Sequence, residues 1–368
     1  MMSGTSLDGV DAAWIETDGE AVRRFGPVLT LPYDPALRGD LRRLLELAPR
    51  LRSGDAFLER CVLRLTKAHI DAVKTLAAKV SAEGMRAATV LGFHGQTILH
   101  RPKRPDDASS TAGRTWQIGD AHALARETGC VVVHDFRSAD VASGGQGAPL
   151  VPVAHAVLSA ALPRPLAVLN LGGVGNVTWI GQDGSLVAFD TGPANGPLDD
   201  WVRLRTGRSF DEDGHLAMAG IADEAVLSRL MAHPYFDQPP PKSLDRLDFD
   251  QALRHAGLER LSAEDGAATL VSFAALCIGV AARHFPRPPR QWLIAGGGRR
   301  NPALIEAITR ALAEPVQKAE SVGWNGDALE AQCFGILAAR SLRGLPISFP
   351  GTTCAPFPMS GGRVSHPL

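Results

Sequence analysis

Two patterns of apolar positions alternate along the chain. Short runs rich in Val, Ile, Leu and Ala are followed by longer stretches in which apolar residues recur every three or four positions. The short runs predict strands at residues 10–15, 88–93, 131–134, 167–171, 177–180, 186–189 and 291–295. The longer stretches predict helices at residues 35–47, 55–80, 196–205, 261–283, 302–312 and 327–342. This alternation of strands and helices is typical of an α/β fold.

Two segments differ in composition from their surroundings. Residues 138–152, SADVASGGQGAPLVP, are Gly-rich and precede a new series of predicted strands, so we expect a hinge there. Residues 238–250, QPPPKSLDRLDFD, are Pro-rich, and we expect a surface loop that acts as a lid or contacts a substrate. The length of 368 residues is enough for about two or three domains.

Composition narrows the class of partner. The 38 Lys and Arg residues nearly balance the 39 Asp and Glu residues, which argues against nucleic acid or an anionic membrane, although a local basic patch stays open. The most apolar stretch, residues 269–282, is too short to span a bilayer, and the N-terminus lacks the regions of a signal peptide. The five cysteines include no CxxC pair, which suits a reducing compartment and gives no zinc site. We therefore expect a cytoplasmic protein.

The segment SGTSLDGVD, residues 3–11, concentrates glycines, hydroxyls and carboxylates. Glycines let backbone N–H groups approach phosphate oxygens, and a carboxylate can hold Mg²⁺ directly or through water. There is no GK[ST], so the segment is not a Walker A loop. A plain hairpin turn would explain the same composition.

A second glycine-rich turn, NLGGVGN at residues 170–176, lies between two predicted strands. Its glycines suggest close backbone approach to a ligand, and a β-bulge is the alternative. Both glycine-rich segments stand beside a β-run that ends in Trp-Ile. Two such hairpins are what a duplicated actin-like nucleotide-binding fold needs, unless the similarity is a coincidence between ordinary hairpins.

Asp190 follows the predicted strand 186–189 and directly precedes the sequence TGPAN, residues 191–195. A carboxylate at the end of a buried strand is well placed as a general base or a Mg²⁺ partner. The alternative is a helix N-cap or an Asx turn, because a helix is predicted from residue 196.

Two further motifs come from the last quarter of the chain. In AGGGRRNP, residues 295–302, Asn301 and Pro302 mark a helix start that would suit an anion or a nucleotide. A Rossmann fingerprint with Glu320 on the ribose is disfavoured, because Asn301 replaces its final Gly or Ala. In GDALEA, residues 326–331, Asp327 and Glu330 lie in one predicted first helical turn, where acids complement the helix dipole.

Taken together, these segments resemble those of the anhydro-N-acetylmuramic acid kinases, in the actin, sugar-kinase and Hsp70 superfamily. The matching segments occur in order: MSGTSLDGVD (2–11), GFHGQTILHRP (92–102), QIGD (117–120), DFRSADVASGGQGAPLVP (135–152), NLGGVGNVT (170–178), FDTGPAN (189–195), IAGGGRRNP (294–302), GDALEAQ (326–332) and GLPISFPGTT (344–353). Two departures are visible. Only Met1 precedes MSGTS, where several β-forming residues are usual, and Cys354-Ala355 follows GTT where Gly-Val is expected.

The resemblance implies an α/β, two-lobed actin-like ATPase (ribonuclease H-like) fold with a deep cleft between the lobes. It places residues 1–140 with about 344–368 in an N-terminal lobe, and residues 141–343 in a C-terminal lobe. It also implies a homodimer that uses ATP and Mg²⁺. The reaction would convert 1,6-anhydro-N-acetylmuramic acid, ATP and water into N-acetylmuramic acid 6-phosphate and ADP, in peptidoglycan recycling. A conventional hydroxyl or carboxyl kinase of the same superfamily and a non-catalytic sugar sensor are the alternatives.

The resemblance also assigns residues to ATP. The first phosphate loop would be Gly4, Thr5, Ser6, Leu7, Asp8, Gly9, Val10 and Asp11; the second would be Gly172, Gly173, Gly175 and Asn176; the adenosine-side turn would be Gly296, Gly297 and Gly298. Asp190 would be the catalytic base, and Asp8 and Asp190 would contact Mg²⁺ through water.

For the sugar, the resemblance points to Arg137 and Glu330, with His94, Gln96 and Thr97 lining the cleft. Arg137 is the natural partner of the lactyl carboxylate of muramic acid, because a guanidinium group can pair with it through two hydrogen bonds. A buried scaffold arginine is the alternative.

Overall fold

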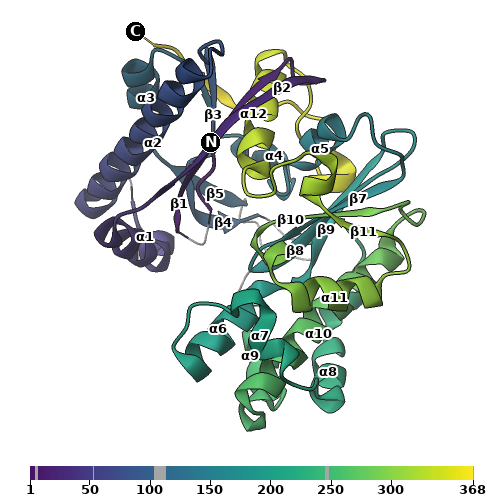
Figure 1. Cartoon of the computed structure of the whole chain (residues 1–368). Helices are drawn as coiled ribbons and strands as arrows, with labels where there is room; N and C mark the ends of the chain where they lie inside the picture. The colour runs from purple at the N-terminus through teal and green to yellow at the C-terminus, as the bar shows by residue number, and fades with distance from the viewer. Residues whose placement is uncertain (5–6, 53, 103–112, 245–247, 368) are drawn as a thin grey trace. The chain divides into compact units, whose positions relative to one another are not determined.

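The computed structural model describes residues 1–4, 7–52, 54–102, 113–244 and 248–367 (Figure 1). The chain forms two compact units, Met1–Ala161 with Ala328–Leu368, and Leu162–Asp327. These bounds differ from the lobes expected from the sequence, because residues 141–161 and 328–343 belong to the first unit. The expected hinge at 138–152 therefore lies inside one compact unit rather than at its end.

The first unit contains three small sheets and the helices that cover them. Its strands are β1 (Gly9–Thr17), β2 (Val22–Pro32), β3 (Val90–Phe93), β4 (Gln96–Arg101), β5 (Arg114–Ile118), β6 (Val131–His134) and β12 (Arg363–Ser365). They pair as β1-β2, β12-β6-β3 and β4-β5. Its helices are α1 (Pro35–Leu47), α2 (Ala56–Ala82), α3 (Ala121–Thr128), α4 (Ser138–Ala142), α5 (Pro152–Leu158), α12 (Leu329–Leu342) and α13 (Pro350–Thr353), and a 3₁₀ turn, η1 (Ala48–Arg50), follows α1.

Local sequence explains where the first two helices begin. The Asp34 carboxylate accepts the Leu37 N–H at 2.8 Å, and Pro35 occupies the first helical position of α1. Asp55 caps α2 in the same way, through the N–H groups of Phe57 and Leu58. The apolar face of α2 packs against β1 and β2 and forms the core there.

The chain before β1 also joins two sheets. Met2 bridges Asp11 in the antiparallel sense, and Ser3 bridges Gln96 in the parallel sense. Beside β3, α12 lies so close that a Cβ on Gly92 would come within 2.0 Å of the Phe334 carbonyl oxygen. Glycine is therefore required at position 92 for α12 to reach the sheet.

The second unit is built on one mixed sheet with the order β11-β10-β7-β8-β9. The strands are β7 (Leu166–Leu171), β8 (Val174–Ile180), β9 (Leu186–Pro193), β10 (Trp292–Ala295) and β11 (Val316–Lys318). The helices are α6 (Asn195–Thr206), α7 (His215–Met218), α8 (Glu224–Met231), α9 (Asp250–His255), α10 (Ala263–Ala281) and α11 (Pro302–Ala311). Short 3₁₀ turns connect them: η2 (Glu212–Gly214), η3 (Pro234–Asp237), η4 (Leu258–Arg260), η5 (Ala282–His284), η6 (Gly297–Arg300) and η7 (Ala319–Val322).

Helix α10 forms the core of this unit and packs against α6, α7, α8, α11 and β9. Together with η5 it forms a 22-residue helix that is long and apolar enough to cross a membrane. The expectation that the apolar stretch is too short holds only for the run 269–282, because the helix begins earlier, at Ala263. Most of this helix is buried in the core of the second unit, so core packing accounts for its apolar composition.

Candidate active site

A hairpin in the second unit brings two predicted site segments together. Strands β7 and β8 are joined by Gly172 and Gly173, as the sequence predicted. Across the next pair of strands, Asn176 is paired with Asp190 and Gly175 with Gly192, so Thr191 is the extra residue of a β-bulge. Bulges re-aim side chains next to functional sites. Here the bulge places Asp190 directly opposite the last residue of the predicted second phosphate loop.

The glycine turn is tied to the start of α6. The N–H groups of Ala194 and Asn195 donate to the carbonyl oxygens of Gly173 and Gly172, each at 3.0 Å, and the Gly196 N–H donates to Gly173 at 3.1 Å. A Cβ on Gly172 or Gly173 would meet no atom closer than 3.4 Å. The main chain of the turn is therefore held in place by hydrogen bonds, while the space where a side chain on Gly172 or Gly173 would stand is uncrowded.

The predicted adenosine-side turn lies beside this hairpin. A Cβ on Gly296, whose φ is +79°, would be 2.3 Å from the Asn170 side-chain oxygen. A Cβ on Gly298 would be 2.6 Å from the Asn195 side-chain nitrogen, which itself donates to the Leu171 carbonyl oxygen at 3.2 Å. Gly297, in contrast, has open space where its Cβ would be.

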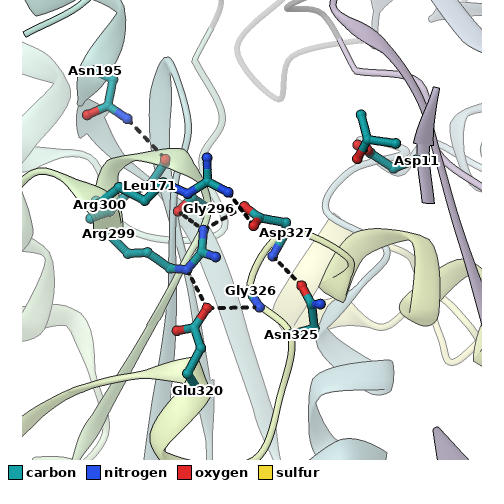
Figure 2. A network of polar contacts seen from close by, with 11 residues as sticks. Asp11, Leu171, Asn195, Gly296, Arg299, Arg300, Glu320, Asn325, Gly326 and Asp327 are labelled. Atoms are coloured by element: carbon teal, nitrogen blue, oxygen red, sulfur yellow. Dashed lines mark hydrogen bonds and ion pairs between the residues drawn. The ribbon is translucent and has the colours of Figure 1, made fainter. Parts of the chain in front are cut away.

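Buried Arg299 holds this turn in place (Figure 2). Its guanidinium donates to the Gly296 carbonyl oxygen at 2.9 Å and forms ion pairs with Glu320 and Asp327, each at 2.8 Å. Arg300 forms a second ion pair with Asp327. The ion pair with Arg299 holds the pKa of Asp327 below its usual range. The Glu320 carboxylate is thus engaged by Arg299 rather than placed for a ribose.

Asp327 corrects one expectation. Helix α12 begins at Leu329, so Asp327 lies before the helix and pairs with arginines, and Glu330 is the acid of the first turn. The shift by two residues has a local cause, because residues 325–327 form a turn in which the Asn325 side chain accepts the Asp327 N–H at 3.1 Å. Sequence reasoning also missed Arg299. The only signal was a basic pair after three glycines, which does not reveal its partners.

Residues 235–244 form a strap against Asp190. The Asp190 N–H donates to the Lys242 carbonyl oxygen at 3.0 Å, and its carbonyl oxygen accepts the Tyr235 hydroxyl. The Leu244 N–H donates to Oδ2 of the Asp190 carboxylate at 2.8 Å. Burial raises the pKa of Asp190 to about 7, and the Leu244 hydrogen bond partly opposes that shift. Part of the Pro-rich segment expected to be a lid or substrate loop therefore holds this carboxylate.

Lys242 was not predicted as a functional residue. Its ammonium group donates to the Tyr235 carbonyl oxygen at 3.0 Å and lies 4.5 Å from the centre of the Tyr235 ring. Burial lowers the pKa of Lys242 to about 8. The Lys242 side chain therefore helps to hold residues 235–244 together through its contacts with Tyr235.

In the first unit, the described residues of the first predicted phosphate loop are Gly4 and Leu7 to Asp11; Thr5 and Ser6 lie outside the described residues. The Leu7 N–H donates to the Gly4 carbonyl oxygen at 3.2 Å, and the Leu7 and Val10 side chains are buried in the core. A ligand could therefore contact Leu7 and Val10 only through main-chain atoms. A Cβ on Gly9 would be 2.3 Å from the Leu31 carbonyl oxygen, so packing of β1 on β2 explains this glycine.

The two acids of this loop differ. Asp8 is 65% exposed and forms an ion pair with Arg38 at 2.6 Å. Asp11 is part of β1, is partly buried, and accepts the Thr30 hydroxyl at 2.6 Å.

The predicted sugar residues centre on Arg137. Its Nη2 and Nε groups lie 2.9 and 3.3 Å from Nε2 of His94, and its Nη1 donates to the Gly147 carbonyl oxygen at 2.7 Å. Burial, and then Arg137 itself, hold the pKa of His94 well below its usual range. The imidazole is therefore neutral and accepts at Nε2. Burial lowers the pKa of Arg137 to about 10, so the guanidinium stays charged at neutral pH.

The remaining predicted sugar residues adjoin this pair. Burial raises the pKa of Glu330, while the charge of Arg137 opposes that shift. Gln96 is buried and donates to the Gly4 carbonyl oxygen at 3.3 Å, which links it to the first loop. Thr97 accepts the Gln117 side-chain amide at 3.2 Å. All five predicted sugar residues belong to the first unit, and all are described.

Sequence comparison with known proteins identifies one family over nearly the whole chain. A family model described as anhydro-N-acetylmuramic acid kinase matches residues 1–366. The anhydro-N-acetylmuramic acid kinase of Acidiphilium cryptum is 56% identical over 100% of this chain and 97% of its own length. That of Paramagnetospirillum magneticum is 53% identical over 100% of this chain and 99% of its own length. Among solved structures, a chain of the PilM-PilN type IV pilus biogenesis complex aligns over 90% of this chain and 96% of its own length, with 12% identity and a TM-score of 0.40.

Relatives of this identity and coverage define the class: a kinase, which uses ATP and acts on an amino sugar. The chain belongs to the anhydro-N-acetylmuramic acid kinase family. The predicted family, the kinase activity and an α/β fold with two compact units are thereby confirmed.

Proposed function

We propose that the protein opens 1,6-anhydro-N-acetylmuramic acid with water while ATP phosphorylates the released O6, in the recycling of peptidoglycan. In this substrate O6 is bonded to C1, so no free hydroxyl exists at that position. Water attacks C1, the C1–O6 bond breaks, and O6 forms the new bond to the γ-phosphorus as ADP leaves. The water gives up a proton, and the products are N-acetylmuramic acid 6-phosphate and ADP.

The observation that carries this proposal is the setting of Asp190. Its Oδ2 is fixed by the Leu244 N–H at 2.8 Å, which leaves Oδ1 to accept a proton from water. A general base works best when its pKa lies near the operating pH, and burial raises the pKa of Asp190 to about 7. Because Asp190 is paired with Asn176, this base stands beside the proposed phosphate loop.

For ATP, we assign the main chain of Gly172, Gly173, Gly175 and Asn176 to one phosphate loop and that of residues 4–11 to the other. The turn Gly296–Gly298 would lie on the adenosine side. The open space at Gly297 supports this assignment, because a nucleotide can approach the main chain there.

Magnesium would accompany ATP and neutralise charge on its phosphates. Carboxylates are suitable partners, since Mg²⁺ prefers oxygen and keeps several waters. Across the described ranges, no three His, Cys, Asp or Glu residues are grouped to hold a metal, which fits an ion held mainly by phosphates and water. Asp190 and Asp8 would contact it through water, although the ion pair of Asp8 with Arg38 makes Asp8 the poorer partner.

For the sugar, we assign the lactyl carboxylate to Arg137. A guanidinium group has five N–H groups, and the contacts with His94 and Gly147 use three of them. The remaining two match the two oxygens of a carboxylate. Glu330, Gln96 and Thr97 would line the rest of the sugar site.

We further propose a cytoplasmic homodimer, with neither nucleic acid nor a membrane as a partner. Support for self-association comes from residues 204–221, where Leu204, Phe210, Met218 and Ile221 are 78%, 58%, 52% and 81% exposed. Large exposed apolar side chains commonly mark contact surfaces. Sedimentation of Ile221→Asp beside the wild type tests this: a wild-type dimer that the variant reduces to a monomer is expected.

The central experiment is an ADP-release assay with 1,6-anhydro-N-acetylmuramic acid and MgATP in ¹⁸O-water. We expect turnover, with one heavy oxygen at C1 of the product and none in the phosphate. Turnover of glucose, glycerol or acetate instead would indicate a conventional kinase. Tight sugar binding without any ATP consumption would indicate a sensor.

A further inference from the structure

The carboxylate of Asp140 is buried inside the first unit. Asp140 belongs to α4 and is 1% exposed. Its Oδ1 accepts the Gly147 N–H at 2.6 Å, and its Oδ2 accepts the Thr353 hydroxyl at 2.5 Å. A buried carboxylate is costly unless it is hydrogen-bonded, and here both oxygens accept a hydrogen bond.

The glycine-rich loop at residues 143–147 wraps around this carboxylate. Gly144 and Gly147 adopt φ values of +92° and +67°, which favour glycine. A Cβ on Gly145 would be 2.1 Å from Asp140 Oδ1, so no side chain fits there. The Gln146 N–H donates to the Thr353 carbonyl oxygen at 2.5 Å. Asp140 and Thr353 together therefore set the path of the loop.

The end of that path is the carbonyl group of Gly147. Asp140 fixes Gly147 through its N–H, and the Gly147 carbonyl oxygen accepts from Nη1 of Arg137 at 2.7 Å. On the other side, Nε2 of His94 accepts from Nη2 of Arg137 at 2.9 Å. The guanidinium plane is therefore held at two places, and the Gly147 contact depends on the loop.

We infer that Asp140 is a positioning residue for sugar specificity: through Gly147 it holds Arg137 in the orientation that receives the carboxylate of the substrate. This inference rests on the proposed role of Arg137. Thr353 acts with Asp140, because its hydroxyl fixes the second carboxylate oxygen. Asp140 itself touches no substrate, so its effect appears as a loss of discrimination between sugars rather than a loss of chemistry.

The test compares two sugars, 1,6-anhydro-N-acetylmuramic acid and 1,6-anhydro-N-acetylglucosamine, which lacks the lactyl carboxylate. The measured quantity is the ratio of their kcat/KM values. Variants Asp140→Ala and Thr353→Val remove the two ends of the contact, and Asp140→Asn keeps an oxygen for the Gly147 N–H. Thr352→Val is the matched control: Thr352 is equally buried in α13, but its hydroxyl donates to the Phe349 carbonyl oxygen at 3.2 Å.

We expect Asp140→Ala and Thr353→Val to lower the ratio about tenfold or more, since misplacement of a binding group by ~1 Å can cost ~10² in rate. Asp140→Asn should stay within about threefold of the wild type, because one modest hydrogen bond changes. Thr352→Val should match the wild type, and KM for ATP should be unchanged throughout. Added to Arg137→Ala, Asp140→Ala should lower the ratio no further.

A different result separates the two proposals. If Arg137→Ala lowers the ratio but Asp140→Ala and Thr353→Val do not, the positioning role of Asp140 is wrong while the role of Arg137 stands. If Arg137→Ala leaves the ratio unchanged, the assignment of the lactyl carboxylate is itself wrong. Equal losses for both sugars in folded Asp140 variants would also overturn the inference, since they indicate a scaffold role. Should Asp140→Ala not fold, Thr353→Val compared with Thr352→Val gives the same decision, because Thr353→Val removes the hydroxyl that fixes Asp140 Oδ2.

Discussion

The two glycine-rich loops that the sequence marks for phosphate differ in what surrounds their glycines. In the second unit, no atom lies closer than 3.4 Å to a Cβ placed on Gly172 or Gly173, and Gly297 has open space. In the first unit, Gly9 is closed in by the Leu31 carbonyl oxygen at 2.3 Å, and the Leu7 and Val10 side chains are core residues. Similar composition therefore occurs in two settings: glycines without close neighbours in the second unit, and a glycine packed against a strand in the first.

The largest expected effect concerns the base of the second unit. Replacing Asp190 by Asn keeps the size of the side chain and its acceptor for the Leu244 N–H, but removes the basic oxygen. We expect kcat to fall by ~10² to 10⁴, with KM for ATP little changed. Steady-state kinetics on a variant with a wild-type melting temperature is the measurement. A folded variant within about tenfold of normal kcat would make Asp190 a turn residue only.

The second prediction uses the pH dependence of the same group. A base must be deprotonated to act, and burial raises the pKa of Asp190 to about 7. Activity is therefore present above that value and lost below it, so kcat/KM should fall about tenfold per pH unit below pH ~7. Lys242, whose pKa is lowered to about 8, stays protonated below that pH, so it does not cause the fall in activity at acid pH. An acid limb near pH 4, where ordinary aspartates titrate, would contradict the buried setting.

A pair of glycine substitutions tests the comparison directly. Gly9→Val should destabilise the fold by about 1–3 kcal/mol or more, because the new side chain meets the main chain of β2. Gly297→Val should leave stability nearly unchanged and raise KM for ATP. Gly39→Ala in α1, which also has open space, is the control: it should leave KM for ATP unchanged and stabilise the fold by about 0.5–1 kcal/mol, because Ala favours the helix more than Gly. If Gly9→Val folded normally and raised only KM for ATP, the two loops would not differ as described.

The smallest effects are expected for two arginines. Arg299→Lys keeps a charge but loses the planar fork that contacts Gly296, Glu320 and Asp327, and we expect KM for ATP to rise about threefold.

Arg38→Ala removes only the exposed ion pair with Asp8, and should change the free energy of unfolding by less than ~1 kcal/mol. Denaturant melts and ATP titrations measure both. An equal rise in KM for the two variants would weaken the distinction between the loops.

How far the sequence predicts the fold depends on whether a signal is local. Helix α1 was predicted with its observed ends, because Asp34 and Pro35 mark its start and a clear apolar stripe follows. Strands β4 and β5 were missed, since they are short and mix buried with partly exposed positions. No local pattern shows that α12 packs on β1 and β3, so the sequence does not indicate that this helix belongs to the first unit.

At the candidate site too, residues with a local sequence signal were predicted and residues without one were missed. Glycine turns and Asp190 have composition signals, and the structure brings Gly172–Asn176, Asp190 and Gly296–Gly298 together within the second unit. The residues that hold them, Lys242 and Arg299, were missed. Their roles come from partners distant in the sequence, such as the Tyr235 carbonyl oxygen and the Glu320 carboxylate.

The strap over Asp190 restricts how this protein can vary. Two of its contacts come from the main chain, the Lys242 carbonyl oxygen and the Leu244 N–H, and both exist whatever side chains these positions carry. Substitution at position 244 by another apolar residue should therefore be tolerated, because Leu244 packs against the core, but proline should not be, because it has no N–H. Insertion or deletion of one residue between positions 242 and 244 would move the donor away from the carboxylate. Among related chains, the length of this short segment should consequently vary less than its sequence.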